Sequence, residues 1–147
     1  MPRVVEVASD GIRVPVARAS VQAAADQVLR GERVRDAHIS VTFLDDRRMA
    51  ALNRKHLGHR GTTDVISFGF APAAEGGPVT GDIYIAPDEA RRNARAHGER
   101  IRDELLRLVV HGTLHVLGHD HPAGEARYAS PMWRRQERVL RRLLGST

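Results

Sequence analysis

Residues 101–121 read IRDELLRLVVHGTLHVLGHDH, and this stretch decides the fold that we expect. Its pattern predicts a helix over about 100 to 117. The last turns of that helix are apolar on nearly all sides, which is typical of a helix at the centre of a domain. Glycine accepts the left-handed backbone conformation that ends helices, so Gly118 predicts the helix end.

Three histidines in this stretch have the spacing of a metal site. His111 and His115 are four residues apart, so on a helix they share one face, with Cβ atoms about 5–6 Å apart. Two such imidazoles reach one zinc ion at about 2.0–2.1 Å, and His121 returns a third ligand after the glycine stop. Three ligands leave the fourth tetrahedral position for water, as in catalytic zinc sites. A single histidine in an apolar helix is more often a hydrogen-bonded core residue, so the third histidine is what favours a metal.

The residues next to these histidines bear on which reaction the site could catalyse. Zinc proteases with a similar helix carry glutamate directly after the first histidine, but this position is Gly112 here, which argues against peptide hydrolysis by that route. Asp120 is the nearest carboxylate and a candidate catalytic residue: it orients a ligand imidazole, acts as a base, or merely caps loop amides. His119 is expected to face solvent or substrate rather than the metal. Asp103 and Glu104 are expected on a solvated face.

The rest of the chain mixes short strands with helices. Hydrophobic residues alternate cleanly from His38 to Leu44, which predicts a strand, and Asp45 is a good N-cap for the next helix. Met49 and Leu52 of that helix are expected to face inward. Further strands are expected over 63–70 and 81–86, a Pro/Gly loop over 71–79, and helices over 17–30, 46–56, 87–97 and 131–144. The expected fold class is α+β, a small mixed sheet of three to four strands packed with about five helices, in a single domain of residues 1–147 with the zinc site at the end of the central helix.

The N-terminal segment has a less regular pattern. Residues 3–7 (RVVEV) alternate between apolar and polar, and residues 12–14 do so more weakly beyond Asp10-Gly11, a favourable turn pair. We therefore expect an edge hairpin here, followed by an alanine-rich helix that Gly31 closes.

Composition narrows the class of protein. The chain has no cysteine, so a metal site must use histidine and carboxylate, and disulfides are excluded. We expect no membrane partner and a cytoplasmic location, because we find neither a secretory signal nor a run of roughly 18 apolar residues. The net charge is +5, and nearly all of the cationic residues are arginines. This charge favours a polyanion such as RNA as a partner, although genome composition can also enrich arginine.

The stretch HGTLHVLGHDH resembles the signature of the YbeY family, with His111, His115 and His121 in the positions of its zinc ligands. Leu52-Asn53, 63–68 (TDVISF) and 81–85 (GDIYI) resemble further blocks of that family in the same order. The resemblance implies a zinc-dependent, single-strand-specific endoribonuclease that matures the 3′ end of small-subunit ribosomal RNA and acts in ribosome quality control. It also implies ribosomal RNA and the small ribosomal subunit as partners, with a small-subunit ribosomal protein or an assembly GTPase as further candidates.

One departure from the family concerns a cation. The family usually has an arginine shortly after the Leu-Asn pair, where it assists at the phosphate, but that position is Leu57 here. Arg54 and Arg60 are our candidate catalytic replacements, and His56 and His59 are also open. Nothing in the sequence selects one of them.

The working hypothesis is metal-assisted hydrolysis of an RNA phosphodiester. Asp64, Ser67 and Asp82 are unexpected in core strands, and each either caps a turn or lines the site. The arginines of the last helix either hold the RNA backbone or form an ordinary solvated face; they are Arg134, Arg135, Arg138, Arg141 and Arg142. Two rivals remain: a zinc hydrolase of peptides or amides, and a non-catalytic ribosome-assembly factor with a structural zinc.

Overall fold

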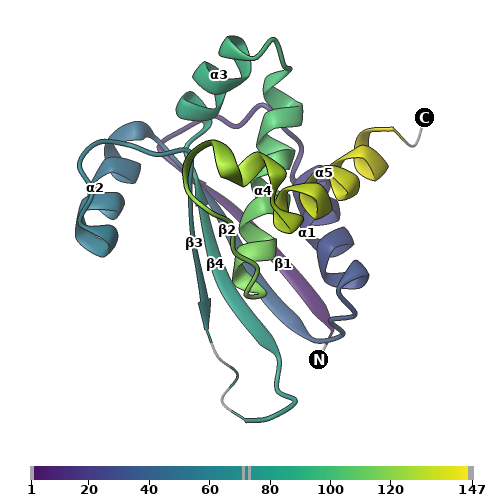
Figure 1. The fold of residues 1–147 in the computed structure, drawn as a ribbon. Helices are drawn as coiled ribbons and strands as arrows, with labels where there is room; N and C mark the ends of the chain where they lie inside the picture. Colours follow the sequence, from purple (N-terminus) through teal and green to yellow (C-terminus); the bar gives the residue numbers. More distant parts are fainter. Residues whose placement is uncertain (1, 71, 73, 146–147) are drawn as a thin grey trace.

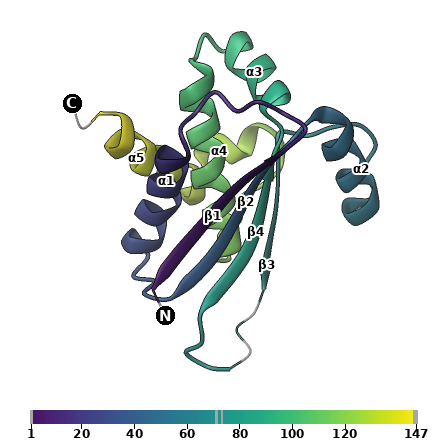
Figure 2. The same ribbon diagram turned by 180° about the vertical axis from the view of Figure 1, so that it is seen from behind.

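The computed structural model describes residues 2–70, 72 and 74–145, and within them four strands form one sheet with helices packed mainly on one face (Figures 1 and 2). The strands are β1 (Arg3–Asp10), β2 (Ala37–Leu44), β3 (Val65–Phe70) and β4 (Val79–Ile85). The helices are α1 (Arg18–Gly31), α2 (Asp46–Leu57), α3 (Pro87–Ala96), α4 (Ile101–Val116) and α5 (Pro131–Leu144), with a short 3-10 helix η1 (Gly124–Ala129) before α5. The expected α+β class is confirmed.

The sheet is mixed, with strand order β1-β2-β4-β3. β1 lies parallel to β2 and β2 parallel to β4, whereas β3 is antiparallel to β4. The expected N-terminal hairpin is wrong, because β1 runs on to Asp10 and pairs with β2 rather than with residues 12–14. A parallel pair needs a long crossover, here built around α1. Ile12 and Val14 pack against the core on the way to that helix.

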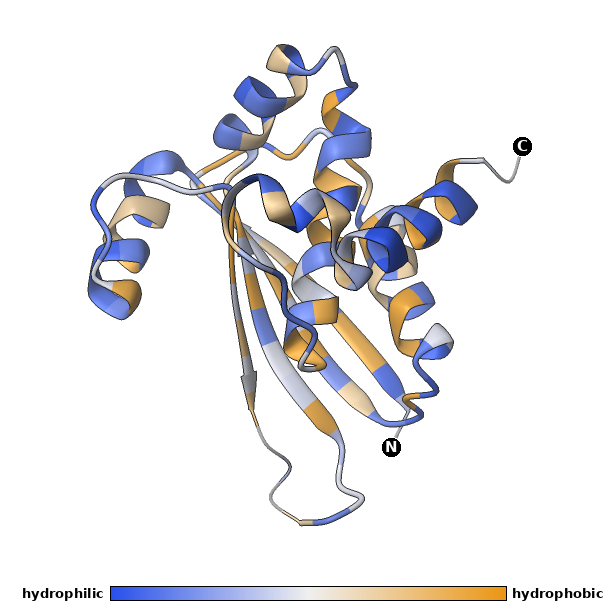
Figure 3. Ribbon diagram, in the orientation of Figure 1, coloured by the Kyte–Doolittle hydropathy of each residue, from blue (hydrophilic) through white to orange (hydrophobic). Residues whose placement is uncertain are grey.

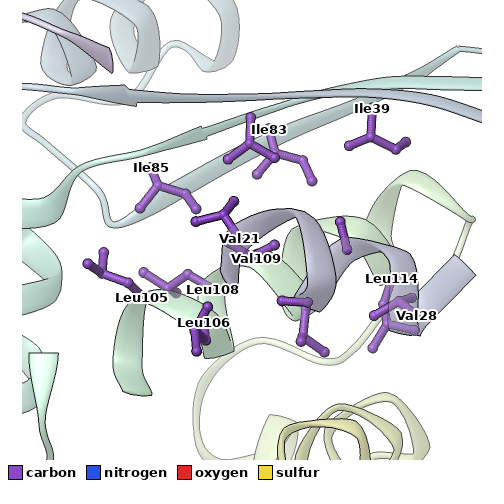
Figure 4. Packing of buried hydrophobic residues seen from close by; sticks show 14 of the residues in the cluster. Val21, Val28, Ile39, Ile83, Ile85, Leu105, Leu106, Leu108, Val109 and Leu114 are labelled. Carbon is purple, nitrogen blue, oxygen red and sulfur yellow. The ribbon is translucent and has the colours of Figure 1, made fainter. Parts of the chain in front are cut away.

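The core lies between the sheet and helices α1 and α4 (Figure 4). β2 presents Ile39, Val41 and Phe43 to the helices, and β4 presents Ile83 and Ile85; all five are buried. Figure 3 shows the matching alternation of hydropathy along the strands. Against these strand residues pack buried side chains of two helices, α1 (Val21, Ala24, Ala25, Val28, Leu29) and α4 (Leu105, Leu106, Leu108, Val109, Val110, Leu114). This packing confirms α4 as the central helix.

Glycines line the contact between helix α4 and the sheet, where there is no space for a Cβ atom. A Cβ atom on Gly112 would lie 2.7 Å from Cγ2 of Ile83, inside the distance that real Cβ atoms keep. A Cβ on Gly69 of β3 would lie 2.7 Å from the carbonyl oxygen of Val116, and one on Gly81 of β4 would overlap the Val116 side chain. Gly112 therefore sits at a helix–sheet contact that has no room for a larger side chain.

Two helix ends show how local chemistry sets the boundaries. Asp45 caps α2 as expected, accepting a hydrogen bond from the Arg48 amide at 2.9 Å. α1 ends at Gly31, but the left-handed residue that follows the helix is Arg33, with φ 61°, rather than the glycine. The Val34 amide then donates to the Leu29 carbonyl at 2.8 Å, which satisfies a carbonyl of the last helical turn.

The C-terminal helix runs over the expected residues 131–144, and Trp133 near its start is half-buried against Tyr128. Among the described residues, no helix has the length and apolar character needed to span a membrane.

Candidate metal centre

Three imidazole rings meet near the C-terminal end of α4. His111 and His115 lie one turn apart on the helix, with ring centroids 4.6 Å apart. The ring of His121 lies 5.1 Å from that of His111 and 5.0 Å from that of His115. One ring nitrogen of each residue lies within 4.8 Å of the others. The structure therefore brings together the three histidines that the sequence singles out.

The loop after α4 returns His121 to the helix. Gly118 takes the left-handed conformation, with φ 96°, and its amide donates to the His115 carbonyl at 2.9 Å. The carboxylate of Asp120 then accepts a hydrogen bond from the His121 amide at 2.8 Å. Asp120 is exposed and shapes the loop, which is the capping role among those weighed for it. Its catalytic assignment stays a prediction.

Each of the three rings is oriented by an oxygen that accepts a hydrogen bond from its Nδ1. The acceptors are Gln136 Oε1 for His111 at 2.6 Å, the His119 carbonyl for His115 at 2.9 Å, and the Pro122 carbonyl for His121 at 2.8 Å. Amide and carbonyl oxygens only accept, so each ring carries its proton on Nδ1 and its lone pair on Nε2. Three Nε2 lone pairs are thus available to one ion.

The geometry and the charge state of the rings both fit a divalent metal. Tetrahedral ligands at about 2.0–2.1 Å from an ion lie roughly 3.4 Å from one another, which small side-chain rotations reach from the observed cluster. Burial above all, with the charges of His115, His121 and Arg127, lowers the pKa of His111 to about 4, although the hydrogen bond to Gln136 opposes this. Burial and the neighbouring His121 also lower the pKa of His115. Neutral imidazole is the form that binds metals, so the residues present fit the ion.

The side chain of His119 is 28% exposed and is held by a carboxylate rather than pointing freely to solvent; its expected role toward substrate stays a prediction. Its Nε2 lies 2.5 Å from Oε1 of Glu32, and Nη1 of Arg135 lies 2.6 Å from the other oxygen of that carboxylate. Burial pushes the pKa of Glu32 upward, but the hydrogen bonds and charges of His119 and Arg135 outweigh it and leave the pKa lowered. The contact ties the metal loop to α1 and α5.

A cavity of about 650 Å³, which we call the side cavity, opens beside His111. Asp64 lines it, and burial raises the pKa of this carboxyl group. Arg107 also lines it and bonds Glu104 at 2.7 Å, Glu137 at 2.9 Å, and Glu99. The expectation that Glu104 belongs to a solvated face is therefore wrong, since this side chain is tied into an ion-pair network.

A second hollow of about 410 Å³ opens beside His115. It is lined by the end of β3, including Gly69 and Phe70, and by the C-terminal end of α4. Phe70 is 52% exposed. The histidine cluster thus borders two hollows, one at His111 and one at His115.

The predicted replacements for the missing cation lie elsewhere. Arg54 and Arg60 are both exposed, on α2 and on the loop after it, and neither lines the side cavity or the second hollow. Leu57 is 48% exposed at the end of α2. The assignment of Arg54 and Arg60 as catalytic residues stays a prediction.

Sequence reasoning missed Gln136 and Arg127. Gln136 is 1% exposed and lies on the same face of α5 as Met132 and Leu140. The spacing of four residues was a usable signal, because a polar residue on a buried helix face needs a partner. Arg127 lies in η1 and lines the side cavity with His111, which no spacing in the sequence indicates.

The fold and the cluster define a class of protein, an α+β domain with a three-histidine site suited to a metal ion. Comparison with known proteins gives the family. The family model described as Endoribonuclease YbeY matches residues 6–144. Proteins named Endoribonuclease YbeY are similar to the chain: the one from Chlorobaculum parvum is 38% identical over 109 residues (74% of each chain), and the one from Thermus thermophilus is 40% identical over 117 residues (76% of this chain and 78% of that one).

A third relative of the same name, from an Anaeromyxobacter species, is 42% identical over 112 residues, which are 75% of this chain and 56% of that protein. The solution structure of TM1509 from Thermotoga maritima shares the fold, with a TM-score of 0.63 at 22% identity, covering 97% of this chain and 91% of that one. The chain belongs to the Endoribonuclease YbeY family.

Proposed function

We propose that the protein is a zinc-dependent endoribonuclease that cleaves single-stranded RNA. The observation that carries this proposal is the cluster of His111, His115 and His121, whose Nε2 atoms are left free by hydrogen bonds at Nδ1. Membership in a family whose members are named endoribonucleases supplies the class of substrate.

The chain's own residues supply binding, orientation and charge. His111, His115 and His121 would hold the ion. Gln136 and the carbonyls of His119 and Pro122 fix the orientation of the three rings by accepting hydrogen bonds from Nδ1. The ion, when bound, supplies a Lewis acid for a phosphoryl oxygen and lowers the pKa of a coordinated water. A peptidase mechanism with a helical glutamate is disfavoured, because the position after His111 is Gly112, packed against Ile83.

Zinc is the proposed metal because three neutral imidazoles with an open position suit it. Nickel or iron would also accept three imidazoles, and availability would then decide between them.

The proposed substrate in the cell is ribosomal RNA of the small subunit, at its 3′ end, with a role in ribosome quality control. The small ribosomal subunit, and a small-subunit ribosomal protein or an assembly GTPase, are the proposed partners in the cytoplasm. The net charge of +5 supports a polyanionic partner of this kind.

Cleavage of a fragment that spans the 3′ end of small-subunit RNA tests the proposal. The zinc-loaded protein is expected to cut the single strand but not a duplex of the same sequence. Chelator should abolish the cut, added zinc should restore it, and His115→Ala should be inactive with an unchanged circular dichroism spectrum. Zinc binding without cleavage would contradict the enzyme and favour an assembly factor. Products with 2′,3′-cyclic phosphate ends would exclude water as the nucleophile.

A further inference from the structure

The side cavity touches the metal site directly. His111, the metal residue on this side, forms part of its wall, and Gln136, which orients that ring, forms another part. Its volume of about 650 Å³ is within the roughly 300–1,000 Å³ range of small-molecule sites. A ligand group bound here would therefore lie next to whatever is held at the metal.

Two arginines line the side cavity, and their charges are used differently. Arg107 is surrounded by Glu99, Glu104 and Glu137, so its charge is neutralised within the protein. Over the described residues, no carboxylate oxygen forms an ion pair with Arg127, although its charge acts on the carboxyl group of Asp64 and Glu125 also lines the cavity. The Nε of Arg127 donates to the Gly124 carbonyl at 3.0 Å, which holds the guanidinium in place and leaves its Nη groups to bind a ligand. Arg127 is the cation of this cavity that can meet a phosphate.

An aromatic wall lies beside that cation. Tyr128 and Trp133 both line the cavity, with ring centroids 4.7 Å apart and an interplanar angle of 85°. The guanidinium carbon of Arg127 lies 5.6 Å from the centroid of the Tyr128 ring. Tyr128 is 50% exposed, so part of its ring is free to stack on a base.

Part of the cavity wall is polar. Asn93 donates from Nδ2 to Oδ2 of Asp64 at 3.2 Å, and both residues line the cavity. Their oxygens are acceptors for the amino or imino groups of a nucleobase. The side cavity thus brings together a metal residue, a cation, an aromatic ring and polar oxygens, which are the groups that the phosphate and the base of a nucleotide would contact.

We propose that the side cavity holds the nucleotide that adjoins the scissile phosphate, with Arg127 contacting that phosphate and Tyr128 stacking on the base. This inference rests on the proposed endoribonuclease function. It places the cation that contacts the phosphate on η1, which follows the metal loop.

Kinetics with a short single-stranded RNA whose cleavage site has been mapped test the inference. Arg127→Gln in the zinc-loaded protein is expected to lower kcat/KM by about 10- to 100-fold and to reduce the salt slope of RNA binding by about one. Arg13→Gln is the control, because it removes the same charge from an exposed loop on which no part of the mechanism depends. Tyr128→Ala is expected to lower kcat/KM about ten-fold, and Tyr128→Phe to keep it.

Abasic substitutions in the RNA locate the cavity on the substrate without altering the protein. Removing the base on one side of the cleaved bond should lower kcat/KM of the wild type about ten-fold. The same change in the RNA should leave kcat/KM of Tyr128→Ala unaltered. The inference fails if the wild type cleaves RNA but Arg127→Gln and Tyr128→Ala have the same kcat/KM and the same response to abasic RNA as Arg13→Gln. The side cavity is then not the nucleotide site.

Binding of the same RNA, followed by fluorescence anisotropy, separates failure of the inference from failure of the proposed function. A wild type that binds the RNA without cleaving it contradicts the endoribonuclease, and loss of that binding in Arg127→Gln still supports the cavity. A wild type that neither binds nor cleaves contradicts both. Circular dichroism and zinc content confirm that each variant is folded and loaded.

Discussion

At His111, burial and one hydrogen bond together prepare a metal ligand. The low-dielectric surroundings lower its pKa to about 4, so the ring is neutral at pH 7. Gln136 fixes the proton on Nδ1 and directs Nε2 toward His115 and His121. The spacing of the three histidines can be recognised in the sequence. The groups that accept hydrogen bonds from their Nδ1 atoms are harder to predict, because two of the three acceptors are backbone carbonyls.

Replacing Gln136 by leucine tests the role of that acceptor. The change keeps the approximate volume of a buried side chain but leaves Nδ1 of His111 without a partner. We expect the zinc dissociation constant to rise about 10- to 100-fold. Competition with a chromophoric chelator measures it. Equal affinity in wild type and Gln136→Leu would contradict the orienting role, and Gln136→Glu, which keeps an acceptor, is the control.

The lowered pKa of His111 also makes the metal-free protein sensitive to acid. The unfolded chain binds a proton at this residue below its ordinary pKa of 6.5, whereas the folded chain binds it only near 4. Stability of the metal-free protein should therefore rise with pH between about 4 and 6.5, by about 3 kcal/mol from this residue. Urea unfolding across that range measures it. His111→Asn keeps a donor for Gln136 without titrating there, so the wild type and this variant should differ in slope; parallel curves would contradict the burial argument.

At the level of elements, α4 and the loop behind it position the site. The helix was predictable because its apolar pattern is strong, and its end was predictable from Gly118. The parallel pairing of β1 with β2 was not, because alternation within a strand does not reveal its neighbour. Local turn chemistry at Asp10-Gly11 favoured a hairpin, but long-range packing through α1 prevailed. The side cavity joins α3, α4, η1 and α5, and such a meeting of distant segments leaves no local pattern.

Two glycine substitutions test the close contact between α4 and the sheet. Gly112→Ala places a methyl group against Ile83, so we expect a loss of about 1–3 kcal/mol in the free energy of unfolding. Gly31→Ala is the matched control: it lies at the end of α1, where a Cβ atom meets nothing within 4 Å, and should leave stability unchanged or raise it by about 0.4–1 kcal/mol. Chemical denaturation gives both values. Equal effects of the two changes would show that α4 does not depend on Gly112.

For the whole molecule, the core and the metal site are separate sources of stability. The buried residues of α1, α4 and the sheet form a continuous hydrophobic cluster, while the three histidines lie at its margin and are only half-buried. The fold class was predictable because this core follows clear periodicities. We accordingly expect the metal-free chain to keep the fold.

Metal binding should then add stability by mass action. With free zinc 100-fold above the dissociation constant, the gain is about 2.7 kcal/mol, or a rise in Tm of roughly 5–10 °C. Thermal unfolding with zinc and with chelator measures the difference. His115→Ala should melt at one temperature in both buffers; a zinc-dependent shift that persists in this variant would place the metal elsewhere.

Metal content per chain tests the central claim most directly. Elemental analysis of the purified protein, after equilibration with zinc and removal of the excess, is predicted to give one ion per chain for the wild type. His115→Ala and His121→Ala, folded by circular dichroism, are predicted to give none. A folded wild type that holds no metal, or variants that keep a full equivalent, would contradict the three-histidine centre.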